Sequence, residues 1–288
     1  MSTDKTIEYY SLDEILKRKA VYNLIIGERS NGKTYAALKY GLEEYLRDGK
    51  EIAIVRRWKE DITGRRARAI WDGIESNNVV KELTDGEYEG IYYYSGRYYL
   101  CNYEDGKAIY NENDVFAHVF ALSDTEHNKG VSHPKVGTII FDEFITKGTY
   151  LRDEFVIFMN TVSTIVRKRT NVRIFMLGNT VNKFNPYFKE MGLTHASLMK
   201  QGTIDLYKYG KKGLTVAIEY SKGSKSRSVN DFYFAFDNSK LDMITDGAWE
   251  LDMYPHVPVK FKPKNIMFVY FIIFNDQVYQ CELVSIND

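Results

Sequence analysis

Residues 27–34 constrain the fold of this chain more than any other stretch, and they read Gly-Glu-Arg-Ser-Asn-Gly-Lys-Thr. The apolar run of residues 21–26 comes before them, and residues 35–42 follow with a helical composition. A strand, a glycine-bounded loop, Lys-Thr and a helix are together typical of a phosphate-binding P-loop. The alternative is a surface turn that ends in Gly-Lys-Thr by chance, and the flanking strand and helix count against it.

Each residue type in this loop has a physical purpose. Glycines at both ends let backbone amides approach a phosphate closely, and the helix N-terminus adds partial positive charge. Lys33 is expected to reach the β- and γ-phosphates, and the Thr34 hydroxyl to ligate Mg²⁺. The role of Arg29 stays open. The residues predicted to bind nucleotide here are Gly27, Glu28, Arg29, Ser30, Asn31, Gly32, Lys33 and Thr34.

Composition limits the classes to which this chain can belong. Its 288 residues suffice for one large domain, or one domain with an appendage. The formal net charge is zero, so any nucleic-acid binding must come from a local patch. Two cysteines, far apart in sequence, predict a reducing compartment without a zinc site or disulfide framework. The longest apolar run, 266–274, is too short to cross a membrane. A membrane is therefore not expected among the partners of this chain.

A second apolar strand, residues 51–55, ends in Arg56 and Arg57. In an α/β sheet the carboxyl ends of the strands carry the ligand, so both arginines are expected at the edge that holds the P-loop. One of them could contact a nucleotide phosphate. A solvated basic strand end and a contact to DNA phosphate are equally open interpretations.

Residues 88–110 have a different pattern. Turn signals at 95–96 and 105–106 separate β-rich runs and predict a small antiparallel meander. Its interleaved Tyr and Arg residues could stack single-stranded bases. Aromatic strands also pair well on any half-buried sheet face, and we favour that structural interpretation.

Residues 136–144 form a nearly unbroken apolar strand that ends in Asp142 and Glu143. This pattern is typical of a Walker B strand buried on both faces. Asp142 is expected beside Thr34 in the Mg²⁺ shell, and Glu143 to orient and polarise the attacking water. A strand with an acidic turn is the alternative. Because small-molecule kinases have less need of the second carboxylate, Glu143 favours an ATPase.

The next strand, 174–177, is followed by Asn179, which is placed to sense the γ-phosphate. Before this strand come three arginines, Arg167, Arg169 and Arg173. They are candidates for an arginine finger donated to the nucleotide of a neighbouring subunit. The alternative is a solvated helix end, where basic residues complement the helix dipole.

The order of these motifs resembles the DNA-encapsidation ATPases of small tailed phages with protein-primed genomes, which are compact relatives of the terminase large subunit. The resemblance covers residues 20–190 and becomes thin after about residue 220. The motifs that carry it are the P-loop, Ile-Val-Arg-Arg at 54–57, Ile-Ile-Phe-Asp-Glu-Phe-Ile at 139–145, Arg-x-Arg at 167–169, Leu-Gly-Asn at 177–179 and Asn-Pro-Tyr-Phe at 185–188.

The resemblance implies an α/β P-loop NTPase of the additional-strand, catalytic-glutamate type, with a mainly parallel sheet flanked by helices. It also implies ATP and Mg²⁺ as cofactors and a homopentameric ring on the portal of a prohead in the host cytoplasm, where it drives double-stranded DNA inward. Some relatives also use a packaging RNA. By the same resemblance, Lys33 and Arg56 act in catalysis within the subunit, whereas Arg167 and Lys129 act across the interface.

The sequence predicts an ATPase domain over residues 1–220, a linker over 221–256 and a β-hairpin within 257–288. The resemblance makes this hairpin the start of a truncated or reduced ribonuclease-H-like domain. We interpret Asp276, Glu282 and Asp288 as surface acids, so no nuclease activity is predicted. DNA-gripping Lys and Arg residues are expected within 60–70 and 222–227, on composition only.

The functional hypothesis is an ATP-driven DNA translocase. Another ring-forming P-loop motor, such as a helicase, would share every nucleotide-site residue. A small-molecule P-loop kinase would give a phosphorylated product and no stimulation by DNA. A binding module without turnover would be insensitive to loss of Glu143.

Overall fold

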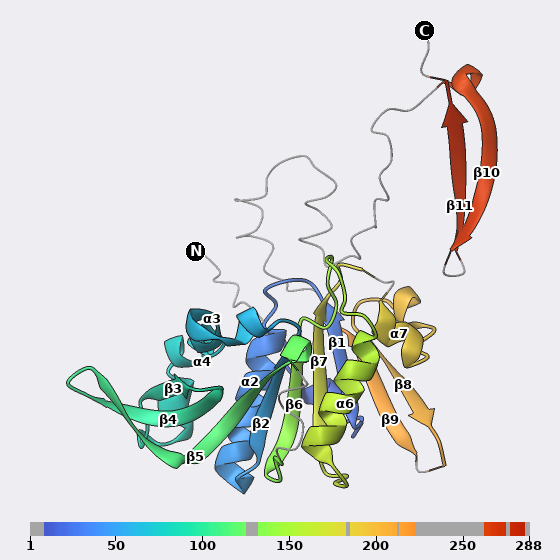
Figure 1. Cartoon of the computed structure of the whole chain (residues 1–288). Helices are drawn as coiled ribbons and strands as arrows, with labels where there is room; N and C mark the ends of the chain where they lie inside the picture. The colour runs from blue at the N-terminus through green and yellow to red at the C-terminus, as the bar shows by residue number, and fades with distance from the viewer. Residues whose placement is uncertain are drawn as a thin grey trace, which may run out of the picture. The chain divides into compact units, whose positions relative to one another are not determined.

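The computed structural model describes residues 9–124, 132–182, 185–211, 213–222, 262–274 and 277–285 (Figure 1). The chain divides into two compact units, Met1–Glu250 and Leu251–Asp288. The helices of the first unit are α1 (Asp13–Leu16), α2 (Lys33–Asp48), η1 (Lys59–Ile62), α3 (Gly64–Ala69), α4 (Asp72–Ser76), α5 (Val79–Leu83), α6 (Glu154–Val166), α7 (Pro186–Glu190) and η3 (Ala196–Leu198). Its strands are β1 (Tyr22–Gly27), β2 (Glu51–Arg56), β3 (Gly90–Tyr94), β4 (Arg97–Glu104), β5 (Lys107–Ala121), β6 (Val136–Asp142), β7 (Arg173–Asn179), β8 (Thr203–Tyr209) and β9 (Leu214–Tyr220).

The described strands of the first unit form one sheet in the order β3-β4-β5-β2-β6-β7-β1-β9-β8. The strands from β5 to β9 in this order run parallel. Strands β3, β4 and β8 join antiparallel at the two edges. Strand β7 lies between the P-loop strand β1 and the Walker B strand β6, as expected for an additional-strand ATPase. The predicted α/β fold with a mainly parallel sheet is therefore confirmed.

Separate hydrophobic cores cover the two faces of this sheet. In β1, Leu24 and Ile26 belong to the core that packs on α6 and α7, whereas Ile25 belongs to the core that packs on α1 and α2. The same alternation runs through β6, where Phe141 and Ile140 face opposite cores. Because successive strand side chains point to opposite faces, strands covered on both sides must be apolar throughout. This explains why the runs at 21–26 and 136–141 are mostly apolar.

The antiparallel insert is larger than the sequence suggests. Strand β5 does not end with the meander but continues to Ala121, where it pairs in parallel with β2. One face of the insert packs on the short helices α3 and α4, and Trp71 there meets Tyr98 and Phe116 edge-on. Tyr98 and Tyr99 are buried, which agrees with the structural interpretation of these aromatic strands.

The second unit contains η4 (Pro263–Asn265) and an antiparallel hairpin of β10 (Ile266–Phe274) and β11 (Gln277–Val284). The hairpin was expected, but its assignment to a ribonuclease-H-like domain stays a prediction. Residues 223–256 of the predicted linker lie outside the described residues, as do Asp276 and Asp288. No helix in the described ranges has both the length and the apolar character needed to cross a membrane.

Candidate nucleotide-binding site

The P-loop curls between the end of β1 and the first turn of α2. Ser30 and Gly32 have left-handed backbone conformations, with φ of 58° and 93°. Gly32 is the N-cap of α2 and has no side chain with which to cap the first turn. The amides of that turn point out of the helix N-terminus, where the helix dipole adds positive charge. This loop therefore offers an anion the backbone donors that a phosphate requires.

The buried ammonium group of Lys33 is held by oxygens of the loop and of β7. Its Nζ donates to the carbonyl oxygen of Glu28 at 2.5 Å, to Asn31 Oδ1 at 3.1 Å and to Asn179 Oδ1 at 3.4 Å. Burial lowers the pKa of Lys33 to about 8, although the charges of Asp142 and Glu28 oppose this effect. A phosphate in the loop would thus lie within reach of both Lys33 and Asn179.

Oxygen ligands suited to Mg²⁺ come together beside the loop. The Thr34 hydroxyl donates to Asp142 Oδ1 at 3.1 Å. Arg56 Nη2 donates to Asp142 Oδ2 at 2.7 Å, and Arg56 Nη1 lies 3.0 Å from Glu143 Oε2. Hydroxyl and carboxylate oxygens are the donors that Mg²⁺ prefers, so Thr34 and Asp142 fit this ion. Across the described ranges, no cluster of three or more His, Cys, Asp or Glu side chains forms another metal site.

A hollow of about 290 Å³ opens among the P-loop, the end of β6 and the end of β7. Predicted residues of the P-loop, of the end of β6 and of the end of β7 meet there because parallel strands end at a common edge of the sheet. A larger hollow of about 440 Å³, beside Tyr45 and Lys135, contains none of these motifs. The residues that line the smaller hollow are Ser30, Asn31, Gly32, Lys33, Thr34, Tyr35, Asp142, Glu143, Leu177, Gly178 and Asn179.

Two segments distant in sequence brace the P-loop. The amide of Tyr10 donates to the carbonyl oxygen of Asn31 at 2.9 Å. From the other side, Asn31 Nδ2 donates to Ser221 Oγ at 3.0 Å, and the Ser221 amide donates to Ile26 O at 2.8 Å. Ser221 is thereby a buried part of the site and not the first residue of a solvated linker.

Comparison with known proteins places the chain in a family. The model of the Podovirus DNA encapsidation protein (Gp16) family matches residues 3–279. The chain belongs to this family. It is 29% identical over 188 residues to the DNA packaging protein of Bacillus phage phi29, which is 64% of this chain and 50% of the relative. It is 30% identical over 182 residues to that of Bacillus phage B103, at 62% and 50% coverage. The matched part thus spans about half the length of these curated relatives.

Solved structures agree with this placement. The N-terminal domain of the DNA packaging ATPase from bacteriophage phi29 matches with a TM-score of 0.57 and 26% identity, covering 76% of this chain and 99% of that domain. The Phi-28 gp11 DNA packaging motor matches with a TM-score of 0.62 and 17% identity, covering 94% of this chain and 78% of that one. At that identity the second match shows the fold alone.

In this encapsidation protein, Arg167 lies far from its own P-loop. It follows α6, whose first residue, Glu154, is joined through Arg57 to the turn after β6, and whose end is joined through Arg169 to the start of that strand. Burial lowers the pKa of His133, a residue that precedes β6, and the charge of Arg167 adds to this effect. The length of a seven-residue strand, about 20 Å, therefore separates Arg167 from the Asp142 end of β6. Lys129, the second residue predicted to act in trans, lies outside the described residues.

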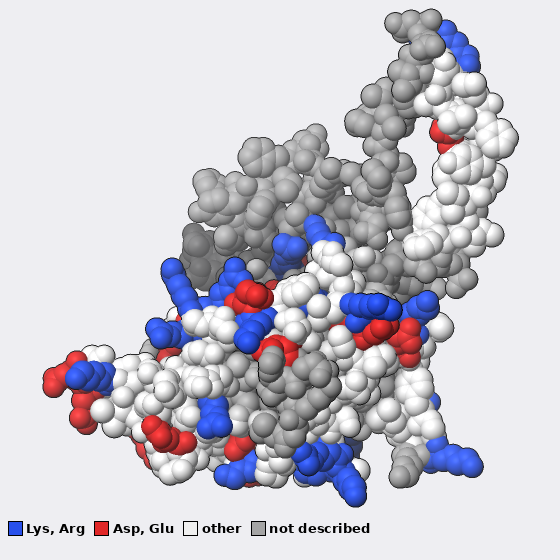
Figure 2. All heavy atoms as spheres, in the orientation of Figure 1, with Lys and Arg blue, Asp and Glu red and all other residues white. Residues whose placement is uncertain are grey.

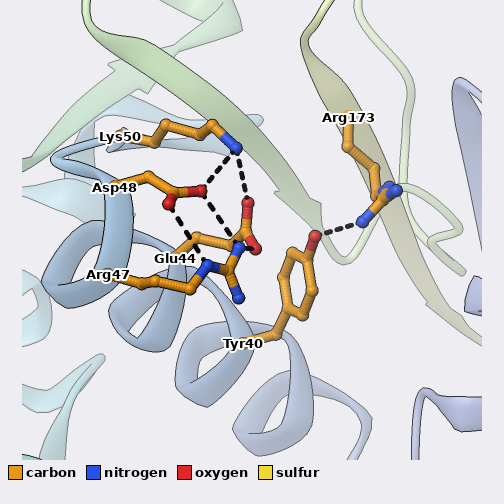
Figure 3. Close-up of polar contacts among 6 residues, drawn as sticks. All are labelled: Tyr40, Glu44, Arg47, Asp48, Lys50 and Arg173. Carbon is orange, nitrogen blue, oxygen red and sulfur yellow. Dashed lines mark hydrogen bonds and ion pairs between the residues drawn. The ribbon is translucent and has the colours of Figure 1, made fainter.

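The other two arginines of the cluster have structural partners. Arg169 donates to the backbone carbonyl oxygens of His133 and Ile165, at 3.0 and 2.9 Å, and ties the end of α6 to the start of β6. Arg173 extends from β7 to the hydroxyl and ring of Tyr40 on α2 (Figure 3). These contacts give Arg169 and Arg173 structural roles within their own subunit.

Sequence reasoning missed a buried network next to the site. Arg57 pairs with Glu154 at the start of α6, and Tyr187 of α7 donates to the same carboxylate. Tyr187 lies in the Asn-Pro-Tyr-Phe segment, which marked the family but had no assigned role. A buried glutamate such as Glu154 has no distinguishing signal in a single sequence.

Proposed function

We propose that this encapsidation protein is the ATP-hydrolysing motor that moves double-stranded DNA into a preformed capsid. The observation that carries the proposal is the convergence of Lys33, Thr34, Asp142 and Glu143 around one hollow beside the P-loop. Membership of the DNA encapsidation family supports DNA as the cargo. The names of the relatives, DNA packaging proteins and a packaging ATPase, support the same function.

The chain's own residues account for each role in hydrolysis. ATP and Mg²⁺, when bound, supply the transferable phosphoryl group and neutralise its charge. Lys33 and the amides of α2 hold the phosphates, and Thr34 and Asp142 hold the metal. Glu143 orients the attacking water and accepts its proton.

Two further residues of the site complete this assignment. Arg56 bonds the carboxylates of Asp142 and Glu143, and it thereby fixes the distance between the metal ligand and the base. Asn179, bonded to Lys33, is placed at the tip of β7 to report loss of the γ-phosphate.

A ring completes the site in this proposal. Because Arg167 lies at the opposite edge of the sheet from its own P-loop, it would serve the nucleotide of an adjacent subunit. Lys129 would act beside it. The ring would be a homopentamer docked on the portal of a prohead in the host cytoplasm, with a packaging RNA as a further component in some relatives.

The DNA-gripping surface is proposed around α3, within the 60–70 segment expected from composition. Arg65, Arg66 and Arg68 are all exposed on this short helix. Two hydrogen bonds anchor the segment, since Tyr98 donates to Ala67 O at 2.7 Å and Tyr93 donates to Ile62 O at 2.9 Å. Figure 2 shows basic side chains gathered over this region. Backbone phosphate is the expected contact, because a packaging motor must pass any sequence.

ATP turnover by the full chain with double-stranded DNA, with single-stranded DNA and without DNA tests this function. We expect stimulation by double-stranded DNA, and loss of turnover in Lys33→Ala. Preference for single-stranded DNA would favour a helicase-like motor, and a phosphorylated small molecule would favour a kinase. Unchanged turnover in Glu143→Gln would remove the assigned base and contradict the mechanism.

A further inference from the structure

The Asn-Pro-Tyr-Phe segment builds the first turn of α7 and directs one tyrosine into the core. Asn185 caps the helix by accepting a hydrogen bond from the Phe188 amide at 3.0 Å, and Pro186 occupies the first turn. Tyr187 is fully buried. Its ring lies 5.5–6.5 Å, between centroids, from the rings of Phe141, Phe144, Tyr150, Phe155 and Phe158.

The Tyr187 hydroxyl is hydrogen-bonded to the buried ion pair of Glu154 and Arg57. It donates to Glu154 Oε1 at 2.7 Å. The same carboxylate receives Arg57 Nε at 2.7 Å on one oxygen and Arg57 Nη2 at 2.8 Å on the other. The amide of Leu151 donates to Glu154 Oε2 at 2.8 Å, and the ring of Tyr150 faces the guanidinium at 5.0 Å. Since burying two charges is costly, such a pair needs every one of these partners.

The remaining donors of Arg57 hold the Walker B turn. Arg57 Nη1 donates to the carbonyl oxygen of Glu143 at 3.1 Å, and Nη2 donates to that of Phe144 at 2.9 Å. Glu143 has a left-handed backbone, with φ of 60°, which side-chain-bearing residues adopt only when the surroundings enforce it. The amide of Phe144 donates to Leu177 O at 3.1 Å. Arg57 and β7 thus enclose the turn that carries the assigned base.

We propose that Tyr187, Glu154 and Arg57 form a positioning relay that fixes the backbone of Glu143 and thereby aims its carboxylate. This inference rests on the proposed ATPase function. The adjacent residues Arg56 and Arg57 then have different roles. Arg56 bonds the side chains of the Walker B acids, and Arg57 bonds the backbone beneath them. None of the relay residues touches the reacting atoms, so they are positioning residues and not catalytic ones.

Tyr187→Phe is the sharpest test, because it removes one hydroxyl and keeps the ring in place. We expect the kcat for ATP to fall about 5- to 20-fold, since a loosened base spends less time in the productive geometry. Nucleotide affinity should stay within about twofold of wild type, because the relay does not touch the P-loop. The matched control is Tyr22→Phe, which deletes the hydroxyl of another buried tyrosine, bonded to Met159 Sδ at 3.7 Å, and should leave turnover unchanged.

Adding Tyr187→Phe to the Glu143→Gln variant separates a positioning effect from a merely structural one. If the relay acts through Glu143, Tyr187→Phe should not further lower the residual turnover of Glu143→Gln. An equal fold-loss in both backgrounds would overturn the relay, as would a kcat within twofold of wild type for Tyr187→Phe. If wild type itself fails to hydrolyse ATP with DNA, the proposed function fails, and the relay falls with it. Active wild type with an equally active Tyr187→Phe would refute the relay alone.

Discussion

Gly27→Ala tests how the first P-loop glycine fits against the end of β9. A Cβ at this position would lie 2.0 Å from Ser221 Oγ and 3.3 Å from Ser221 Cβ. Ser221 cannot retreat easily, since its amide is bonded to Ile26 O and its hydroxyl accepts from Asn31. Overpacking of this kind costs about 1–3 kcal/mol, and loss of the bond to Asn31 would add about 1 kcal/mol. The expected decrease in the free energy of unfolding is therefore about 2–4 kcal/mol.

Urea unfolding of four proteins would measure this cost: wild type, Gly27→Ala, Ser221→Gly and the double variant. The double variant removes the clashing hydroxyl, so it should recover at least about 1 kcal/mol relative to the sum of the single changes. The matched control is Gly73→Ala in α4, where the new Cβ meets nothing closer than Tyr35 Cδ2 at 3.6 Å. It should be neutral or stabilising by up to about 1 kcal/mol. Strictly additive changes, or a fully stable Gly27→Ala, would refute the packing argument.

Three further predictions follow from the site and its surroundings. Glu143→Gln should lower kcat by about 10²- to 10⁴-fold with little change in nucleotide affinity, measured by single-turnover and equilibrium binding assays. Arg167→Ala and Lys33→Ala should each be inactive alone and recover turnover when mixed, and full activity of Arg167→Ala by itself would rule out action across the interface. Burial lowers the pKa of His133 to about 4. The unfolded chain therefore binds this proton from about pH 6.5 downward while the folded chain does not. The free energy of unfolding should consequently fall as the pH is lowered from about 6.5 to about 4, and His133→Phe should flatten this part of the profile.

Most of the fold could be predicted because its signals are local. The apolar strands buried on both faces, the glycine-bounded loop and the turns of the meander are each visible within ten residues. The long second half of β5 was missed because residues 111–115 are mostly polar and give no continuous strand pattern. Strand β8 was missed for a related reason, since it is an edge strand with no buried residue and hence no continuous apolar run.

The arrangement of the candidate site was also largely predictable. Parallel strands end at one edge of their sheet, so placing the P-loop, Asp142 and Asn179 at strand ends was enough to bring them together. By contrast, spacing alone could not separate Arg56 from Arg57, which are neighbours in the chain. Successive strand residues point to opposite faces. Arg56 accordingly reaches the Walker B carboxylates, and Arg57 reaches Glu154 on the α6 side of the sheet.

The sequence by itself predicted the chemistry: a phosphate loop, a metal ligand, a base and a sensor, each assigned from a contiguous motif. The tertiary structure decided what supports that chemistry. Arg57 and Glu154 are 97 positions apart, and Asn31 and Ser221 are 190 apart. Contacts at such separations depend on how the whole sheet and its helices pack, and no local pattern encodes them. The P-loop and Walker B turn were therefore visible from the start, whereas the groups that brace them became visible only in the folded chain.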